Sequence, residues 1–452
     1  MKILVAGNGK VGETLVKQLS SEGYDITLID SDTRVLEYEL DKYDVMAVEG
    51  NCASMDTLRS ADVQSADLLI ATTGMDELNL LCCVTAHGMN PKLHTIARIR
   101  TPEYLEQAYS MRDTFGLSMS FNPERQAARE IERLIKYPGF LKRDSFARGQ
   151  VEIVELRVDA DSKLKDIALN SIHSIVKCQV LVCSVLRNGE AITPDGNFVL
   201  REGDRIFVTA PSKNLSTLLK NLGVVTKRAK KATLIGGGAV SYYLAQYLID
   251  SRIDVTIIEE NKDRCIQLAS LLPKASVIHG DARDQHILDQ ENFDNSDAVV
   301  ALTEMDELNI IVSLYARDRG VSQIITKLDK DSENRIIDNL PLGSVICPRK
   351  LCCNTIVRYV RAMKNQTGAA TAIHSIADGS AEAMEFRVDA STLNCKTPLK
   401  SIKLKKNILV ACISRGHETH IPNGDSSFEV GDTLLVISTA NEVITQLNDI
   451  FE

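Results

Sequence analysis

The sequence predicts an α/β fold in which a doubly wound parallel sheet, followed by a small α/β lobe, occurs twice in tandem. Three observations support this prediction. Short apolar runs alternate with helical patterns, a glycine-rich loop follows the first run, and the same order of features returns in the second half of the 452 residues. This length exceeds what one hydrophobic core usually serves, so several domains are expected.

The apolar runs between Met1 and Phe121 have the length and composition of buried strands. Helical patterns separate them, which is typical of a parallel sheet with helices on both faces. Ligands of such sheets bind at the carboxyl ends of the strands. The runs are Ile3–Ala6, Ile26–Ile29, Val45–Val48, Leu68–Ala71 and His94–Ile99.

A glycine-rich loop joins the first strand to the first helix. Gly7, Gly9 and Gly12 have G-x-G-x-x-G spacing, in which the glycines allow a tight turn, close approach of a pyrophosphate and close helix packing. The second strand ends in Asp30, whose carboxylate can accept hydrogen bonds from a ribose diol. A 2′-phosphate would be repelled there. The pattern therefore indicates a Rossmann-like site for NAD or an adenine nucleotide, in preference to NADP.

The remaining strand ends carry small or cationic residues. Gly50-Asn51-Cys52 follows the third strand and Thr72-Thr73-Gly74 the fourth, so both leave room for a nucleotide. Arg98 ends the fifth strand and can pair with a phosphate.

The chain between the two halves contains a helix and a small lobe. Residues Pro123 to Tyr137 form a helical pattern with one strongly charged face, which fits either a solvated connector or a subunit-bridging helix. After Gly149 come short β segments, Val151–Val158, Gln179–Arg187 and Arg205–Thr209, with no glycine loop and no catalytic cluster.

The whole plan then repeats. Gly236 stands 229 positions after Gly7, and Glu259 stands the same distance after Asp30. The pentapeptide Met-Asp-Glu-Leu-Asn occurs at both 75–79 and 305–309. An offset this steady indicates tandem duplication, with the boundary near the basic stretch Lys227–Lys231. Further matches are Gly280-Asp281-Ala282 with residues 50–52, Ile325-Thr326-Lys327 with residues 96–98, and the turns at 422–424 and 430–432 with those at 194–196 and 202–204.

Composition limits the possible partners and compartments. The net charge of −9 argues against nucleic acid as the main partner. No signal peptide and no long apolar run is found, so a role at the membrane is expected only through a partner protein. The 11 cysteines are odd in number and lack zinc-type C-x-x-C pairs, which favours reduced thiols in a cytosolic protein.

Taken together, the repeated glycine loop, the acid, the Thr-Thr-Gly and Asp-Glu-Leu-Asn segments and the appended lobe resemble TrkA-type proteins, built from tandem RCK (KTN) domains. The resemblance implies a peripheral cytoplasmic regulator of a Trk-type potassium uptake system, on the inner face of the membrane, that binds NAD(H) or ATP/ADP. It also implies a homotetrameric ring beneath a membrane potassium translocator. The implied domains are residues 1–123 and 231–348 for nucleotide binding, and 143–227 and 369–452 for the C-terminal lobes.

The resemblance also assigns nucleotide-binding positions. In the first half they are Gly7, Asn8, Gly9, Lys10, Val11, Gly12, Asp30, Asn51, Cys52, Thr72, Thr73, Gly74 and Arg98. In the second half they are Gly236, Gly238, Ala239, Val240, Glu259, Asp281 and Lys327.

The second half departs from the first at several of these positions. Ser241 replaces the third glycine, Ala239 replaces the cationic Lys10, and Lys327 stands in place of Arg98; in the other direction, Asn51 stands where the second half has Asp281. A serine adds only a small side chain, so the fold should survive. We therefore expect two unequal sites, of which the first is better suited to a polyphosphate.

An NAD-dependent dehydrogenase is the alternative function, since the same glycine loop would serve it equally well. Such an enzyme needs a substrate lobe with a proton donor or base facing the nicotinamide, whereas here β segments and turns follow each nucleotide domain. The paired acids Asp76-Glu77 and Asp306-Glu307 are expected to begin helices and to cap them or complement their dipoles.

Overall fold

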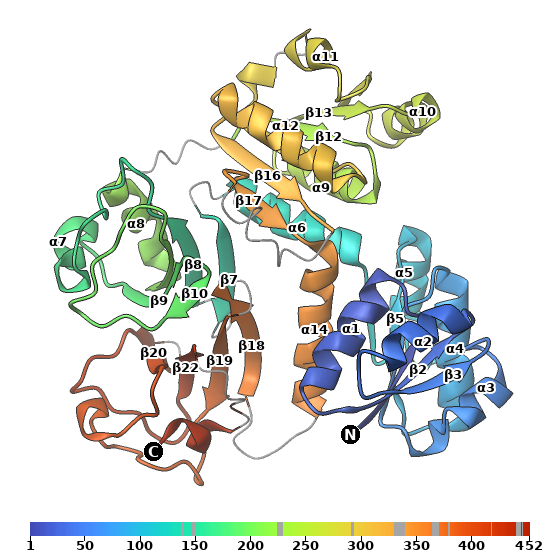
Figure 1. Ribbon diagram of the computed structural model, residues 1–452, viewed down its shortest axis with the longest axis horizontal. Helices are drawn as coiled ribbons and strands as arrows, with labels where there is room; N and C mark the ends of the chain where they lie inside the picture. The colour runs from blue at the N-terminus through green and yellow to red at the C-terminus, as the bar shows by residue number, and fades with distance from the viewer. Residues whose placement is uncertain are drawn as a thin grey trace. The chain divides into compact units, whose positions relative to one another are not determined.

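The computed structural model describes residues 1–136, 140–146, 150–223, 229–290, 293–329, 340–363, 370–377, 380–416, 418–439, 444 and 446–452 (Figure 1). The chain forms two compact units. The first contains Met1–Ala127 with Cys347–Tyr359, and the second contains Ala128–Ile346 with Val360–Glu452. Tyr137 and the first two residues of the basic stretch, Lys227 and Arg228, lie outside the described residues.

The first unit is built on a six-stranded parallel sheet of order β3-β2-β1-β4-β5-β6. This is the doubly wound order, in which the direction of winding reverses between β1 and β4. All five predicted strands are present, and β6 is a sixth that the sequence did not reveal. The strands are β1 (Lys2–Ala6), β2 (Asp25–Asp30), β3 (Met46–Glu49), β4 (Leu68–Ala71), β5 (His94–Arg98) and β6 (Met119–Phe121).

Helices cover both faces of this sheet (Figure 1). Leu4, Leu69 and Ala97 from the strands pack with Cys82 and Cys83 in one buried core. The helices are α1 (Lys10–Ser21), α2 (Thr33–Leu40), α3 (Met55–Ser60), α4 (Asp76–Met89) and α5 (Pro102–Ser110).

The second unit repeats this sheet in the order β14-β13-β12-β15-β16-β17. The predicted fold class, two tandem Rossmann-like sheets, is therefore confirmed. The strands are β12 (Lys231–Ile235), β13 (Asp254–Glu259), β14 (Ser276–His279), β15 (Ala298–Ala301), β16 (Gln323–Lys327) and β17 (Ser344–Ile346), with helices α9 (Ala239–Asp250), α10 (Lys262–Leu271), α11 (Gln285–Gln290) and α12 (Asp306–Asp318).

Two small antiparallel sheets share one topology, β7-β8-β11-β9-β10 and β18-β19-β22-β20-β21. Their inner faces meet in a common core that includes Cys183, Phe207, Ala411 and Leu435. The strands are β7 (Lys142–Phe146), β8 (Val151–Arg157), β9 (Leu181–Arg187), β10 (Glu190–Ile192), β11 (Arg205–Pro211), β18 (Ala370–Ile376), β19 (Ala381–Arg387), β20 (Ile408–Arg415), β21 (Glu418–His420) and β22 (Thr433–Ser438).

The repeated glycine turns of the small lobes each contain an ion pair whose aspartate is buried. Asp204 is 1% exposed and accepts two hydrogen bonds of 2.7 Å from the Arg187 guanidinium. Asp432 and Arg415 make the same pair at 2.9 and 2.8 Å. This bidentate geometry explains why both halves place Gly-Asp at this turn.

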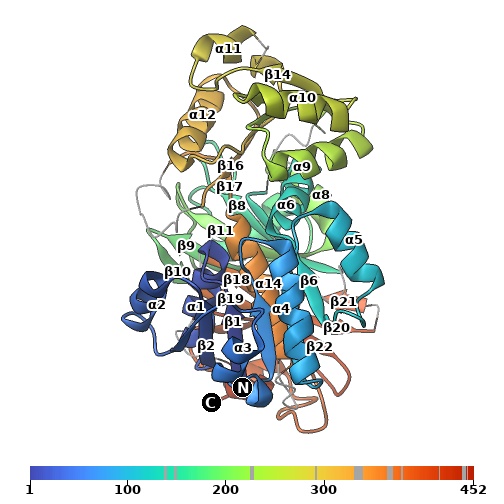
Figure 2. The same cartoon turned by 90° about the vertical axis from the view of Figure 1, so that its right-hand side faces the viewer.

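Two helices link the halves. α6 (Pro123–Lys136) packs its later turns on the second sheet's lobe, where Glu132 accepts from Ser251 and the Leu134 carbonyl accepts from Gln323. Within the first unit, the start of α14 (Pro348–Met363) packs on α1, with Cys353 Sγ 3.7 Å from the Val11 carbonyl (Figure 2). These contacts show that α6 is not a solvated connector, whereas the alternative of a bridge between subunits stays a prediction.

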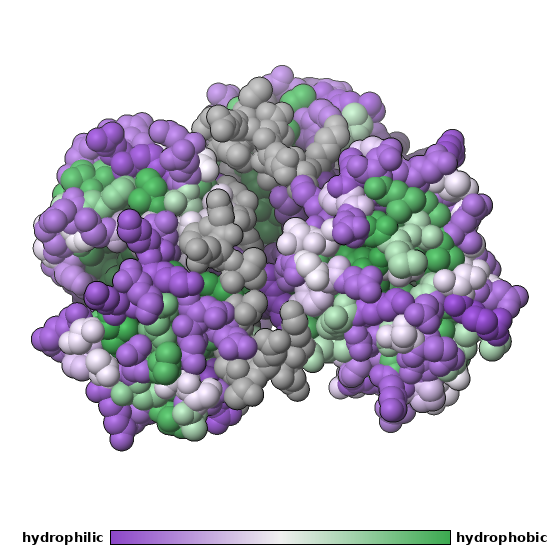
Figure 3. Space-filling view, turned by 60° about the horizontal axis from the view of Figure 1, so that its bottom comes forward, coloured by the Kyte–Doolittle hydropathy of each residue, from purple (hydrophilic) through white to green (hydrophobic). Residues whose placement is uncertain are grey.

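The face in Figure 3 is largely hydrophilic and carries separate apolar patches. Among the described residues, no helix combines the length and apolar character that a bilayer span requires.

Replacing Asp204 with alanine should lower the free energy of unfolding by about 2 to 4 kcal/mol, because the Arg187 guanidinium and the Arg201 N–H lose a buried acceptor. Urea denaturation followed by circular dichroism measures this. Glu202→Ala is the matched control, since its ion pair with Lys165 is exposed and should cost at most about 0.5 kcal/mol. Equal effects of the two substitutions would contradict the assignment.

Candidate nucleotide-binding site

The first glycine of each loop has a conformation that only glycine adopts readily. Gly7 has φ +92° and Gly236 has φ +97°. A Cβ at Gly7 would lie 2.8 Å from Thr73 Cα, and one at Gly236 would lie 3.0 Å from Thr303 N. The loop is therefore held directly against the segment that follows β4 or β15, at the point where the winding of the sheet reverses.

The second glycine of each loop faces open space. A Cβ added at Gly9 or Gly238 would meet no atom within 4 Å. Both residues are helix N-caps without a side-chain hydrogen bond, for α1 and α9 respectively. Helix N-termini left open in this way bind phosphate groups. The residues present thus fit the phosphates of a nucleotide.

The third position differs between the halves but keeps its packing. A Cβ at Gly12 would lie 2.1 Å from the Gly7 carbonyl oxygen. Ser241 occupies this position in the second half, where its hydroxyl donates to the Gly236 carbonyl and is fully buried. The second loop has therefore adjusted to the serine, and its fold is retained as expected.

The acid that ends the second strand holds each loop by the same two contacts. Asp30 accepts from Asn8 N at 2.7 Å and from Asp32 N at 3.0 Å. Glu259 accepts from Gly237 N at 2.6 Å and from Asn261 N at 2.7 Å. Each carboxylate oxygen uses one acceptor position in these bonds, so capacity for a ribose diol remains.

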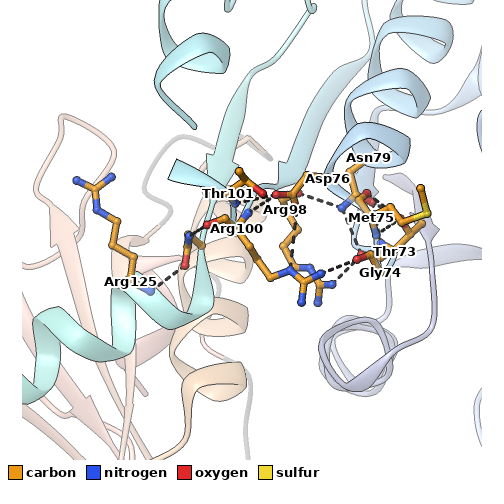
Figure 4. Close-up of polar contacts among 10 residues, drawn as sticks. Thr73, Gly74, Met75, Asp76, Asn79, Arg98, Arg100, Thr101 and Arg125 are labelled. Carbon is orange, nitrogen blue, oxygen red and sulfur yellow. Dashed lines mark hydrogen bonds and ion pairs between the residues drawn. The ribbon is translucent and has the colours of Figure 1, made fainter. Parts of the chain in front are cut away.

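Two arginines converge on the segment that follows β4 (Figure 4). Arg98 donates to the Thr73 carbonyl at 2.7 Å, and Arg100 donates to the Gly74 carbonyl at 2.5 Å. Burial, and then the like charge of Arg100, lower the pKa of Arg98. Arg98 Nε is buried and has no hydrogen-bond partner among the described residues. This pair of cations is suited to an anionic ligand.

The second half keeps one of these cations and adds an acid. Lys327 donates to the Thr303 carbonyl at 3.2 Å, as Arg98 does to Thr73. Asp329 stands two residues later, in the place of Arg100, and its carboxylate lies 3.6 Å from Lys327 Nζ.

The repeated pentapeptide fixes the edge of the sheet. Asn79 is fully buried, accepts from Thr73 N at 2.8 Å and donates to the Arg98 carbonyl at 3.0 Å. Asn309 makes the same contacts with Thr303 and Lys327. These asparagines join two strand ends that would carry the ligand.

The acids of this pentapeptide lie in the first helical turn, where they complement the helix dipole as expected, but they are not the N-caps. Met75 and Met305 are the N-caps, without side-chain cap bonds, and the acids lie in the first turn. Asp76 instead accepts from the backbone N–H groups of Arg100 and Thr101. Asp306 likewise accepts from Asp329 N. The acids tie the helix start to the next strand end.

The other expected residues occupy varied environments. Lys10 is exposed at the first position of α1, and its counterpart Ala239 carries no charge. The Cys52 side chain is 4% exposed and belongs to the core. Asp281 is bound by Arg283, which lowers its pKa, whereas the Asn51 side chain accepts from Ala53 N. Val11, Val240 and Thr72 are buried beneath their loops.

A buried carboxylate lies beneath the first loop. Glu39 of α2 is 1% exposed and hydrogen-bonds the Asn8 side chain, and burial raises its pKa. One Glu39 oxygen has no partner among the described residues. The second half has Gly237 and Leu268 in these two places, and they are in contact range. A polar pair thus replaces an apolar one under the first loop only.

Sequence reasoning missed Arg100, Asn79, Glu39 and Arg264. Arg264 donates to the Gly237 carbonyl at 2.7 Å and places a cation beside Glu259 in the second half. The alternation Arg-x-Arg against Lys-x-Asp at the end of the fifth strand was available as a signal for Arg100. The burial of Asn79 and Glu39 could not be read from isolated polar residues in helices.

Comparisons with known proteins find TrkA domains and TrkA proteins along the chain. The TrkA-N domain matches residues 3–115 and 232–348, and the TrkA-C domain matches residues 153–223. The chain is 32% identical over 451 residues to a Trk system potassium uptake protein TrkA homolog of Archaeoglobus fulgidus, with 100% of both chains covered. It is 28% identical over 459 residues to TrkA of Haemophilus influenzae, covering 100% of this chain and 99% of that one.

Solved structures show the same fold. The GsuK channel bound to NAD has a TM-score of 0.62 at 17% identity, covering 97% of this chain and 77% of that one. GsuK bound to ADP has a TM-score of 0.52 at 14% identity, covering 80% and 70% respectively.

Replacing Glu39 with glutamine should raise the free energy of unfolding at pH 7 by about 1 to 3 kcal/mol, the usual cost of burying an incompletely paired polar group. Burial raises the pKa of Glu39 in the folded state. The wild-type protein therefore keeps its full free energy of unfolding below the ordinary carboxyl pKa, and part of that free energy is lost as the pH rises through the folded-state pKa of Glu39. The advantage of the variant should therefore vanish near about pH 4 and grow toward neutrality.

Thermal or urea unfolding at several pH values measures this difference. Glu37→Gln, on the exposed face of the same helix, is the control and should change stability by at most about 0.5 kcal/mol. A glutamine variant that is less stable than wild type at pH 7 would show that the charge of Glu39 is compensated.

Proposed function

Because this chain belongs to the TrkA family, we propose that it is the regulatory subunit of a Trk-type potassium uptake system that senses nucleotides in its two Rossmann-like lobes. NAD(H) is one ligand and ATP or ADP the other. Nucleotide binding selects one arrangement of the lobes, and that arrangement opens or closes a membrane potassium translocator.

One observation carries this proposal. An open helix N-terminus, closed by an acid that holds the loop backbone, is built twice with the same contacts at Asp30 and Glu259. The same backbone positions are used although the two acids differ in length. Two copies of one cradle in a single chain support sensing as the function.

The chain is a regulatory protein and not an enzyme, as its family membership shows. The alternative of an NAD-dependent dehydrogenase is set aside on this ground. In the part of the chain that the structure describes, the lobes beside each cradle contribute antiparallel strands and turns.

Nucleotide ligands are supported by the fit of the cradles. The glycine loops would hold the phosphates and Asp30 or Glu259 the ribose. The solved GsuK relatives of this fold include forms bound to NAD and to ADP. Family and fold together support both ligand classes for this chain.

A ring of several copies accounts for decisive switching. Coupling between two sites typically transmits about 1 to 3 kcal/mol, whereas moving an equilibrium from 1:99 to 99:1 takes about 5.5 kcal/mol. Several nucleotides bound to a homotetramer would supply the difference. In this proposal the ring lies in the cytoplasm at the inner face of the membrane. It contacts the membrane only through the translocator and has no nucleic-acid partner.

Asp30→Ala should weaken NADH binding at the first site by about tenfold or more, since a charge-assisted pair of ribose contacts is lost. Isothermal titration calorimetry on the full chain measures this. Glu259→Ala should reduce total binding less, and Asp25→Ala, at the exposed opposite end of β2, should leave binding unchanged. Equal losses in the two acid variants would contradict unequal sites.

Cells that lack this chain should accumulate potassium poorly at low external potassium. Wild-type chain should restore uptake, whereas a chain carrying both Asp30→Ala and Glu259→Ala should restore it poorly, because neither cradle retains its acid. Potassium uptake is followed by flame photometry in a strain without other potassium transporters. Full rescue by the double variant would separate uptake from nucleotide binding and refute the proposal.

A further inference from the structure

We propose that Glu39 and Asn8 form a proton-binding site beneath the first glycine loop, and that a nucleotide bound in this loop drives the uptake of a proton by Glu39. Glu39 is then a positioning residue, since it contacts Asn8 and not the ligand. In the second half, a leucine and a glycine stand in these two places. The inference rests on the proposed function, because it adds proton linkage to nucleotide binding in the first half.

Two buried acceptor atoms of this pair lack a hydrogen-bond donor among the described residues. They are Glu39 Oε2 and Asn8 Oδ1. Glu39 is 1% exposed, and its other carboxylate oxygen accepts from the Asn8 amide group. A carboxylate that faces a primary amide in this way leaves one oxygen of each group without a donor. Buried acceptors without a donor cost free energy.

One proton on Glu39 supplies the missing donor. A neutral carboxyl group has an O–H donor and keeps a carbonyl acceptor. With Glu39 neutral, its O–H can donate to Asn8 Oδ1 while its other oxygen still accepts from Asn8 Nδ2. The two side chains then form a pair of parallel hydrogen bonds, and both acceptors are satisfied. The proton comes from solvent.

A bound pyrophosphate favours the protonated form of this site. Asn8 immediately precedes Gly9, the open N-cap of α1 where the phosphates would lie. The backbone N–H of Asn8 donates to Asp30 at 2.7 Å, which fixes the residue in the loop. The negative charge of the ligand repels the buried Glu39 carboxylate and does not repel the neutral carboxyl group. Ligand binding and proton binding therefore strengthen each other.

The charged and titratable neighbours of Glu39 leave this direction unchanged. Burial raises the pKa of Glu39, and the hydrogen bond from Asn8 opposes this. Glu13 of α1 raises the pKa of Glu39 more than the exposed Lys42 lowers it. Tyr43 also faces this region, where Glu39 raises the pKa of its phenol while Lys42 and Lys17 lower it.

The second half supplies a comparison within the same chain. Gly237 occupies the place of Asn8, and Leu268 that of Glu39. A Cβ at Gly237 would lie 2.6 Å from Leu268 Cδ1, so apolar atoms fill the space under this loop. Glu259 holds the loop amide as Asp30 does, so this acid is common to both halves. Proton uptake that occurs only when the first loop is filled therefore points to Glu39.

Calorimetric titration with NAD in buffers of different ionisation enthalpy counts the protons taken up per nucleotide bound. NAD is the probe because it lacks a terminal phosphate, whose second pKa of about 6 would add protons of its own. The full chain carries Glu259→Ala, which weakens the second loop. It should take up about 0.3 proton or more per NAD at the pH of greatest uptake. The NAD affinity should fall about fourfold or more as the pH rises from about 5 to about 8.

Glu39→Gln in the same background tests the assignment. Glutamine can pair with Asn8 as a neutral glutamate would, but it cannot take up a proton. NAD should still bind, with an uptake below about 0.1 proton and an affinity nearly independent of pH. Glu13→Gln is the matched control, because it removes the carboxylate that acts on the site from α1. It should keep the uptake.

Two further measurements do not depend on the folding of the glutamine variant, and thermal melting checks the folding of every variant. Asp30→Ala leaves mainly the second loop to bind, so this chain should take up no proton with NAD. Infrared difference spectra of the Glu259→Ala chain should show that NAD increases the carbonyl band of a protonated carboxyl group.

The outcomes separate this inference from the proposed function. NAD binding without proton uptake, uptake that persists in Glu39→Gln or is lost in Glu13→Gln, or equal uptake in the Asp30→Ala chain would each overturn the inference. Each of these results would leave nucleotide sensing intact. A wild-type chain that binds no nucleotide would overturn both.

Discussion

The hydrogen bond between a strand-ending carboxylate and a loop amide is the contact on which both sites depend. Asp30 and Glu259 lie at the ends of β2 and β13, next to the strands that enter the glycine loops. By accepting the N–H of Asn8 or Gly237, they hold each loop in the conformation that leaves its second glycine open. The parallel sheet makes this possible because its strand ends meet at one edge.

Duplication within one chain allowed the two cradles to diverge while this contact was kept. In a ring of identical single repeats, every site would carry the same charges. Here the first half has a polar pair, Asn8 and Glu39, under its loop, and the second half has an apolar one. The fifth strand ends in two cations in one half and an ion pair in the other.

Helices α6 and α14 each pack on an element of the repeat that they do not follow in sequence. Each follows one parallel sheet in sequence, and the described contacts of α6 with Ser251 and Gln323, and of α14 with Val11, lie on the lobe of the other repeat. The α14 contact is made at the start of the first glycine loop's helix.

The sequence by itself determined the fold class, the duplication and the loop residues, because strand periodicity, glycine spacing and a constant offset are local patterns or direct repeats. The boundaries of the four domains and the ligand roles of the site residues stay predictions. Only the tertiary structure decided the roles of Asn79, Arg100 and Glu39, and it moved Asp76 from a helix cap to a tie between strand ends. The physical reason is that burial and pairing arise between residues distant in sequence. Polar side chains in a helix have no periodic signal that shows which strand end they will meet.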